Sequence, residues 1–191
     1  AVAHQLRQYV LDRSKERKCL GIRLVQAAYH NRSLALYTKL GFGAREPLSV
    51  LQGRPLATPA SDCGVRPASA RDLEACAKLH QRLHGFNRAG DLALAVAQGS
   101  ARVVERNGLI TGYTAGIGFF GHTVGESNRD ITALISEAAT ISGPGFLVPT
   151  RNTVLLRWCL DHGLRIVQPL TLMTKGFYRK PRGAYLPSIL F

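Results

Sequence analysis

The feature that most constrains this chain is an internal repeat with an offset of 122 residues and no gaps. The matching segments are Gly41-Phe42 with Gly163-Leu164, Leu24-Val25 with Phe146-Leu147, and Glu46–Leu51 with Gln168–Met173. A match that keeps Gly, Gln/Glu, Ser/Thr and the strand–helix–strand order implies two copies of one fold. If the second copy begins near Val65, the first would begin well upstream of residue 1. We therefore expect about half of the first copy to be missing.

Length and composition are those of a globular chain. The 191 residues are 46% apolar and 19% charged, enough for one large domain or one and a half small ones. No run approaches the roughly 18 apolar residues of a membrane-spanning helix. The charged start, with Arg7, Arg13 and Lys15, is unlike a signal peptide. We expect a cytoplasmic protein with no membrane contact.

The net charge of +13 is spread over the whole chain. Ten of the Lys/Arg and four of the Asp/Glu lie in residues 1–62, so both copies carry a similar excess. Nucleic-acid binders more often concentrate their charge on one element with interleaved aromatic residues. We therefore do not expect a nucleic-acid partner, whereas a basic surface suits a polyphosphorylated ligand.

The cysteines argue against zinc and against a disulfide framework. Cys19, Cys63, Cys76 and Cys159 are far apart and form no CxxC pair. We expect free thiols in a reducing compartment and no bound metal.

Hydrophobic periodicity and turn residues predict the elements of each copy. In the first copy we expect a helix over 1–18, a strand over 22–29, a helix over 33–40 and an extended segment over 47–51. In the second we expect helices from Ala70 and over 91–98, 130–139 and 154–162, and strands over 102–105, 109–119, 146–148 and 166–174. Ser69 and Asp72 predict a capping box, and Asn107-Gly108 a hairpin turn.

A stretch rich in Gly, Pro, Ser and Thr separates the copies. It divides the chain into a first domain over 1–54, a linker over 55–64 and a second domain over 65–191. The aromatic-rich end, 174–191, is expected to complete a sheet or to pack against the first copy.

The segment from Ser33 to Phe42, SLALYTKLGF, resembles a motif of the GNAT family of acetyl-CoA-dependent N-acetyltransferases. The family form is Asn-x-x-Ala-x-x-Leu-Tyr-x-Lys-Leu-Gly-Phe. This chain has His30 at the Asn position and Asn31 one place later. The resemblance implies an α+β fold in the three-layer GNAT arrangement. It would be a partial half-domain followed by a complete, diverged domain with a mixed central sheet.

The same resemblance implies acetyl-CoA bound at the splayed strands of the sheet. Tyr37 matches the tyrosine that acts as general acid and protonates the departing CoA thiolate; the alternative is that Tyr37 only packs between helix and sheet. His30, Asn31 and Ser33 fall at the cofactor-binding end of the motif.

Counting back at the family's spacing puts Ala1, Val2, Ala3 and His4 at the pyrophosphate loop. There, backbone N–H groups at a helix N-terminus face the phosphates. The residues before Ala1 are not in the sequence, so the loop is incomplete.

The second copy departs further from the motif. The offset puts Asn152 at the Asn position and Cys159 at the Tyr position, and Gly125 alone survives of the loop glycines. Glu126 would bring a negative charge near a pyrophosphate, which the helix dipole argument disfavours. We interpret Cys159 as a buried structural thiol. His122 and Glu126 are candidates for a different ligand.

Two functions fit these patterns. The first is an enzyme that transfers an acetyl group from acetyl-CoA to a primary amine of a small molecule or peptide, with a non-catalytic second domain. The second is a non-catalytic acyl-CoA-binding or scaffold protein. Half a sheet has unpaired edges. We therefore expect the first copy to be unstable or to bind a partner, such as a second copy of the chain in a homodimer. The alternative is that the second copy lends it a strand.

Overall fold

The computed structural model describes residues 2–55 and 64–190, with side chains placed from residue 8 onward. The helices are α1 (Val2–Glu16), α2 (Asn31–Lys39), η1 (Ala70–Asp72), α3 (Leu73–His84), α4 (Ala89–Ala97), α5 (Asn128–Ser136) and α6 (Thr153–Asp161). The strands are β1 (Gly21–Ala27), β2 (Gly43–Gln52), β3 (Gly64–Pro67), β4 (Arg102–Arg106), β5 (Leu109–Thr114), β6 (Thr123–Gly125), β7 (Phe146–Pro149), β8 (Arg165–Gly176) and β9 (Ala184–Leu186). Among the described helices, none is both long and apolar enough to cross a membrane.

The strands form two sheets. Sheet A has the order β1-β8-β2-β7, and sheet B the order β3-β4-β5-β6-β9. Every pairing in both sheets is antiparallel. The α+β class is as predicted, but the mixed central sheet is wrong, because no described strand pair is parallel.

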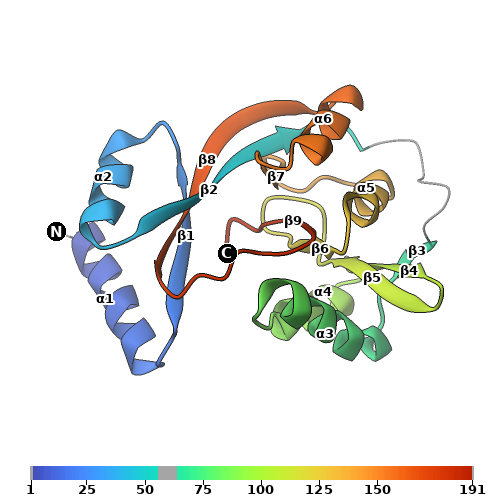
Figure 1. Cartoon of the computed structure of the whole chain (residues 1–191), viewed down its shortest axis with the longest axis horizontal. Coiled ribbons are helices and arrows are strands. Elements are labelled where there is room, and N and C mark those ends of the chain that lie inside the picture. The colour runs from blue at the N-terminus through green and yellow to red at the C-terminus, as the bar shows by residue number, and fades with distance from the viewer. Residues whose placement is uncertain (1, 56–63, 191) are drawn as a thin grey trace.

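Some elements recur at the 122-residue offset. Helix α6 begins and ends 122 residues after helix α2, and β8 begins 122 residues after β2. The copies are not separate domains in tandem, however. β8 of the second copy lies between β1 and β2 of the first copy (Figure 1). In the same way, β2 of the first copy lies between β8 and β7 of the second copy. The second copy therefore does lend the first copy a strand.

Two equivalent prolines mark the limits of the outer strands in sheet A. Pro47 pairs with Thr171, and Pro169 pairs with Ser49, along the ladder that joins β2 and β8. A proline has no N–H to donate to a second neighbour. β1 and β7 end at these points, and the next N–H groups, of Ala28 and Thr150, donate to the carbonyls of Pro169 and Pro47 at 3.0 Å.

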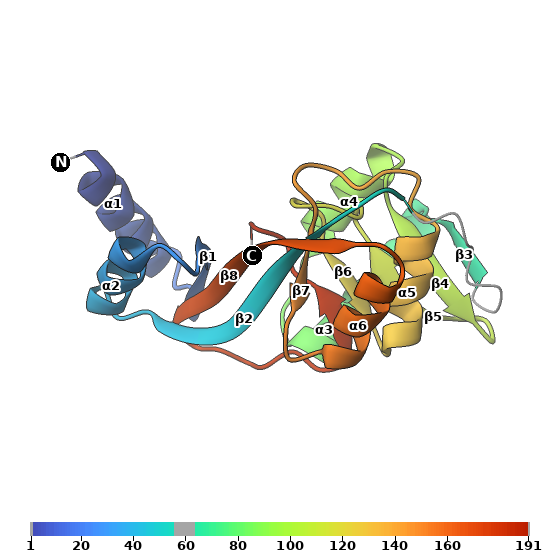
Figure 2. The same ribbon diagram turned by 90° about the horizontal axis from the view of Figure 1, so that it is seen from above.

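The N-terminal elements stand at one end of sheet A and the remaining helices gather at the other (Figure 2). Leu11 of α1, Leu34 and Tyr37 of α2, and Met173 of β8 share one apolar cluster, so both helices pack on the β1–β8 end of the sheet. At the other end, α5 and α6 bury residues such as Ile131 against the strands of both sheets.

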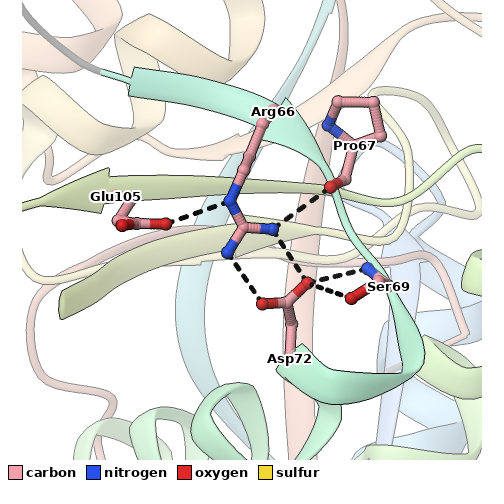
Figure 3. Close-up of polar contacts among 5 residues, drawn as sticks. All are labelled: Arg66, Pro67, Ser69, Asp72 and Glu105. Carbon is pink, nitrogen blue, oxygen red and sulfur yellow. Dashed lines mark hydrogen bonds and ion pairs between the residues drawn. The ribbon is translucent and has the colours of Figure 1, made fainter. Parts of the chain in front are cut away.

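Sheet B is fixed to its first helix by a polar network (Figure 3). The predicted capping box is confirmed, with Ser69 bonded to Asp72 through both its backbone N–H and its hydroxyl. Arg66 of β3 donates to both carboxylate oxygens of Asp72, at 2.9 and 2.8 Å, and to Glu105 of β4 at 3.0 Å. The Arg66 guanidinium holds the pKa of Asp72 well below its usual range.

Several boundaries differ from the sequence predictions. The strand expected over 109–119 ends at Thr114, because the chain leaves the sheet there and returns only for the short β6. The extended segment expected over 47–51 is longer, because β2 pairs along its whole length with β8. The closing segment supplies β9, which completes sheet B. Most of the predicted linker lies outside the described residues, so the boundary at 55–64 stays a prediction.

Candidate functional site

The motif segment forms helix α2 and the turn that follows it. Gly41 adopts φ +86°, a left-handed conformation that favours glycine and ends the helix. The N–H of Phe42 then bonds to the carbonyl of Tyr37 at 3.0 Å, and the buried Phe42 ring packs edge-on against the Tyr37 ring at 5.9 Å. Leu-Gly-Phe therefore folds the chain back from α2 into β2.

Tyr37 lies partly buried between α2 and sheet A. Its ring belongs to the apolar cluster, which is the packing role foreseen as the alternative. Its hydroxyl has no hydrogen-bond partner among the residues that the structure describes. Packing therefore holds the ring in place.

The N-terminus of α2 has no side-chain cap, unlike that of the equivalent helix α6. His30 is the N-cap residue but makes no side-chain cap hydrogen bond, and its ring Nδ1 instead lies 3.3 Å from the Ser33 hydroxyl. Asn31 and His30 are exposed and Ser33 is partly so, and no acidic residue occupies the first turn. By contrast, the side chain of Asn152 caps α6 and Ser127 caps α5. The structure thus brings His30, Asn31 and Ser33 together at an uncapped, positively polarised helix end.

β1, which leads into α2, is the edge strand of sheet A. Among the described residues it pairs with β8 alone, so its other edge presents unpaired backbone groups. Gln26 of β1 is 6% exposed, and neither its amide nitrogen nor its amide oxygen has a partner among the described residues. Such an orphaned buried amide fits a ligand that carries amides of its own.

The residues predicted for the pyrophosphate loop are not part of β1 or α2. Val2, Ala3 and His4 form the first turn of α1, a different helix from the one that carries Tyr37. Ala1 lies outside the described residues, and the side chains of the other three are not described. Their assignment to a phosphate-binding loop stays a prediction.

In the second copy, the predicted ligand contacts are used within the protein. Gly125 is buried in β6, where a Cβ would lie 2.7 Å from the Cβ of Asp130, so glycine is needed for α5 to pack. Asn152 exchanges two side-chain hydrogen bonds with Asn128, at 3.1 and 2.7 Å. Glu126 forms an ion pair with Arg82.

The place between β6 and β7, where the two sheets part, is filled by β9. Its residues pair with Thr123–Gly125 of β6, and β9 also contacts β7. Ala184, Tyr185 and Leu186 are all at most 3% exposed. β7 is equivalent to β1 under the 122-residue offset. Among the described residues β1 pairs with β8 alone, and no strand corresponding to β9 lies beside it.

Cys159, at the position equivalent to Tyr37, is fully buried in the core, as predicted. Burial raises the pKa of its thiol to about 12, which keeps it protonated. Cys76 is buried in the same manner, and its pKa is also raised to about 12. Cys19 is exposed.

The sequence did not predict a cluster of three histidines, although it made His122 a candidate for a different ligand. His80 and His84 of α3 meet His122, which precedes β6, in a buried cluster whose ring nitrogens lie within 4.8 Å of one another. Burial lowers the pKa of His80 to about 4 and that of His84 to about 2, so both are neutral at pH 7. The expectation of no metal rested on cysteine spacing, which says nothing about histidines. The four-residue spacing of His80 and His84 was visible, but the third member is distant in sequence.

Comparison with family models and with curated protein sequences gave no match. Among solved structures, the chain is similar to a putative acetyltransferase from Pyrococcus horikoshii, with TM-score 0.69 and 17% identity over 94% of this chain. A GCN5-related N-acetyltransferase from Anabaena variabilis gives TM-score 0.53 and 13% identity over 89% of this chain. A GNAT-family acetyltransferase from Colwellia psychrerythraea gives TM-score 0.50 and 13% identity over 82%. The chain spans 60%, 49% and 65% of these three proteins, respectively. It therefore shares its fold with GNAT acetyltransferases of known structure.

Proposed function

We propose that the protein is an acetyl-CoA-dependent N-acetyltransferase whose cofactor binds along β1 and the N-terminus of α2. The proposal rests chiefly on the asymmetry between the copies. Among the described residues, β1 pairs with β8 alone and α2 has no side-chain cap, whereas in the second copy β9 packs beside β7 and Asn152 caps α6. Only the first copy also keeps a tyrosine at the motif position.

The residues at this place suit the groups of coenzyme A. An edge strand can hydrogen-bond an extended chain that bears amides, and Gln26 offers a further buried amide. The uncapped N-terminus of α2, with Arg32 in its first turn, favours an anionic group. Acetyl-CoA supplies an activated acetyl group. Tyr37 would donate the proton that a departing thiolate requires.

In this proposal the two copies are a duplicated GNAT unit, and the second copy is non-catalytic. It supplies β8 to the first copy's sheet and completes its core. The acceptor is a primary amine of a small molecule or a peptide. The second candidate function, a non-catalytic acyl-CoA-binding protein, would use the same binding place without turnover.

A matched pair of variants tests the place of binding. Asn31 and Thr153 are equivalent exposed residues in the first turns of α2 and α6. An aspartate is well tolerated in the first turn of a helix, so both variants should fold. We expect Asn31→Asp to weaken acetyl-CoA binding, measured by isothermal titration calorimetry, and Thr153→Asp to leave it unchanged. Weaker binding in Thr153→Asp and unchanged binding in Asn31→Asp would instead assign the acetyl-CoA site to the second copy.

Turnover separates the enzyme from the binding module. Release of free CoA thiol with a panel of primary amines would support the enzyme, and Tyr37→Phe should then lower kcat by about 10²- to 10⁴-fold. Undiminished turnover in Tyr37→Phe would contradict the assignment of the general acid. Tight binding of acetyl-CoA without turnover on any amine would favour the binding module.

A further inference from the structure

A cluster of three buried histidines lies where α3 meets the chain just before β6. His80 and His84 are four residues apart on α3, so they project from one face of that helix. His122 comes from a different part of the chain. The three residues are 0%, 0% and 2% exposed, and one ring nitrogen of each lies within 4.8 Å of the others.

One hydrogen bond of His80 shows which ring nitrogen carries the hydrogen. Its Nδ1 lies 2.6 Å from the carbonyl oxygen of Phe86, which can only accept, so Nδ1 carries the hydrogen. The lone pair of His80 is therefore on Nε2, which lies 3.2 Å from Nε2 of His122. Two nitrogens bound to one tetrahedral ion at about 2.0–2.1 Å are about 3.3 Å apart. A carbonyl that receives the other ring N–H is the usual support of a metal-bound imidazole.

His84 is the member that the fold alone does not explain. It is fully buried, and neither of its ring nitrogens has a hydrogen-bond partner among the described residues. It is surrounded by the rings of His80, His122 and Tyr185, with centroids 4.6, 5.6 and 5.1 Å away. A buried polar group without a partner is costly, and an ion that accepts a lone pair accounts for it.

Two cavities border the cluster. His84 lines a cavity of about 390 Å³ together with Arg23 and Phe86, and His122 lines another of about 710 Å³. No cysteine or carboxylate among the described residues joins the three histidines as a ligand. Of the nearby cations, Arg88 is paired with Asp91, and Arg23 lies over the Phe86 ring at 4.4 Å.

We propose that His80, His84 and His122 bind one Zn²⁺ ion, and that a fourth position, open to the cavity beside His84, takes hydroxide or another small anion. Three neutral imidazoles with an open position are a common zinc donor set, whereas calcium and magnesium require oxygen ligands. The positive charge of Arg23 favours an anion in the fourth position. The three histidines are none of the residues to which acetyl transfer is assigned above, although Arg23, which faces the proposed fourth position, lies on β1.

Zinc binding to the untagged protein, stripped with a chelator and dialysed, tests the site. We expect one Zn²⁺ per chain by calorimetry and by elemental analysis, and a higher melting temperature with Zn²⁺. His84→Leu removes a side chain without hydrogen-bond partners and replaces it by an apolar one of similar size, so the metal-free variant should fold normally. It should lose at least about 100-fold in zinc affinity.

His162→Gln is the matched control, since His162 is exposed and lies outside the cluster. It should bind zinc as the unmodified protein does. Equal affinity in His84→Leu, loss of binding in His162→Gln, or no stoichiometric binding at all would each overturn the proposal.

Co²⁺ tests the coordination geometry. We expect an intense visible spectrum, typical of tetrahedral Co²⁺, that changes when azide is added. A weak octahedral spectrum would overturn the three-histidine site, and an intense spectrum indifferent to azide would overturn its open position.

Discussion

Replacing Asp72 by asparagine should remove the charge that ties β3 to the start of α3. The Asp72 side chain is 9% exposed and accepts two hydrogen bonds from Arg66 and two from Ser69 (Figure 3). An amide that keeps its oxygen at the place of Oδ2 still accepts from Ser69, but it turns its NH₂ group toward the Arg66 nitrogen that bonds Oδ1. Breaking a buried pair costs about 3–5 kcal/mol. Arg66 is 40% exposed and keeps Glu105, so we expect a loss of about 2–3 kcal/mol at pH 7.

The pH dependence distinguishes this mechanism from a packing defect. The pKa of Asp72 is lower in the folded protein than its unfolded value of about 3.9. The unfolded state therefore binds more protons between the two values, and the stabilisation is present above about pH 5 and lost as the pH falls through the folded pKa. The difference in unfolding free energy between the two proteins should shrink steadily below pH 5.

Urea denaturation followed by circular dichroism, at several pH values from 7 to 3, measures both effects. Glu74→Gln is the control, because Glu74 is exposed on α3 and pairs only with its neighbour Lys78; it should unfold like the unmodified protein. An Asp72→Asn deficit that is the same at pH 3 as at pH 7 would refute the electrostatic reasoning. A deficit below about 0.5 kcal/mol at pH 7 would show that Arg66 is satisfied without Asp72.

Two further outcomes follow from buried side chains. Asp130 is 0% exposed, caps α5 and pairs with Arg106 at 2.8 Å. Asp130→Ala should therefore lower the free energy of unfolding, measured by urea denaturation, by about 3–5 kcal/mol. A loss under about 1 kcal/mol would mean that water replaces Asp130 as the partner of Arg106. In the native protein, an alkylating reagent should modify the exposed Cys19 within minutes and the buried Cys159 only after unfolding, as peptide mapping by mass spectrometry would detect. Modification of Cys159 at the rate of Cys19 would contradict its burial.

The sequence was sufficient for much of the local structure. Helical periodicity located α2 and α6, and the Ser69 capping box marked the start of a helix. Each of these signals lies within a few residues of the element that it specifies. Local preferences were consistent with the final fold, and the predictions drawn from them hold.

The interlocking of the copies could not be predicted in the same way. β8 pairs with β1 and β2 across more than 100 residues, and alternating apolar residues do not say which strand is the neighbour. The histidine cluster could not be predicted for a similar reason, because His122 reaches His80 and His84 only through the packing of α3 on sheet B. Family motifs pointed to Asn152 and Gly125, but only the fold shows that Asn128 and β9 engage them.

The interlocked sheet also explains why a duplicated fold would keep a single open site. Each copy needs the other's long strand, so the second copy cannot be lost even if it binds nothing. Freed from binding, it can fill the space beside β7, where β9 pairs with β6 and packs three buried residues near β7. Filling the same space in the first copy would close β1 and α2. One acetyl-CoA per chain, and not two, is therefore the stoichiometry that this arrangement predicts.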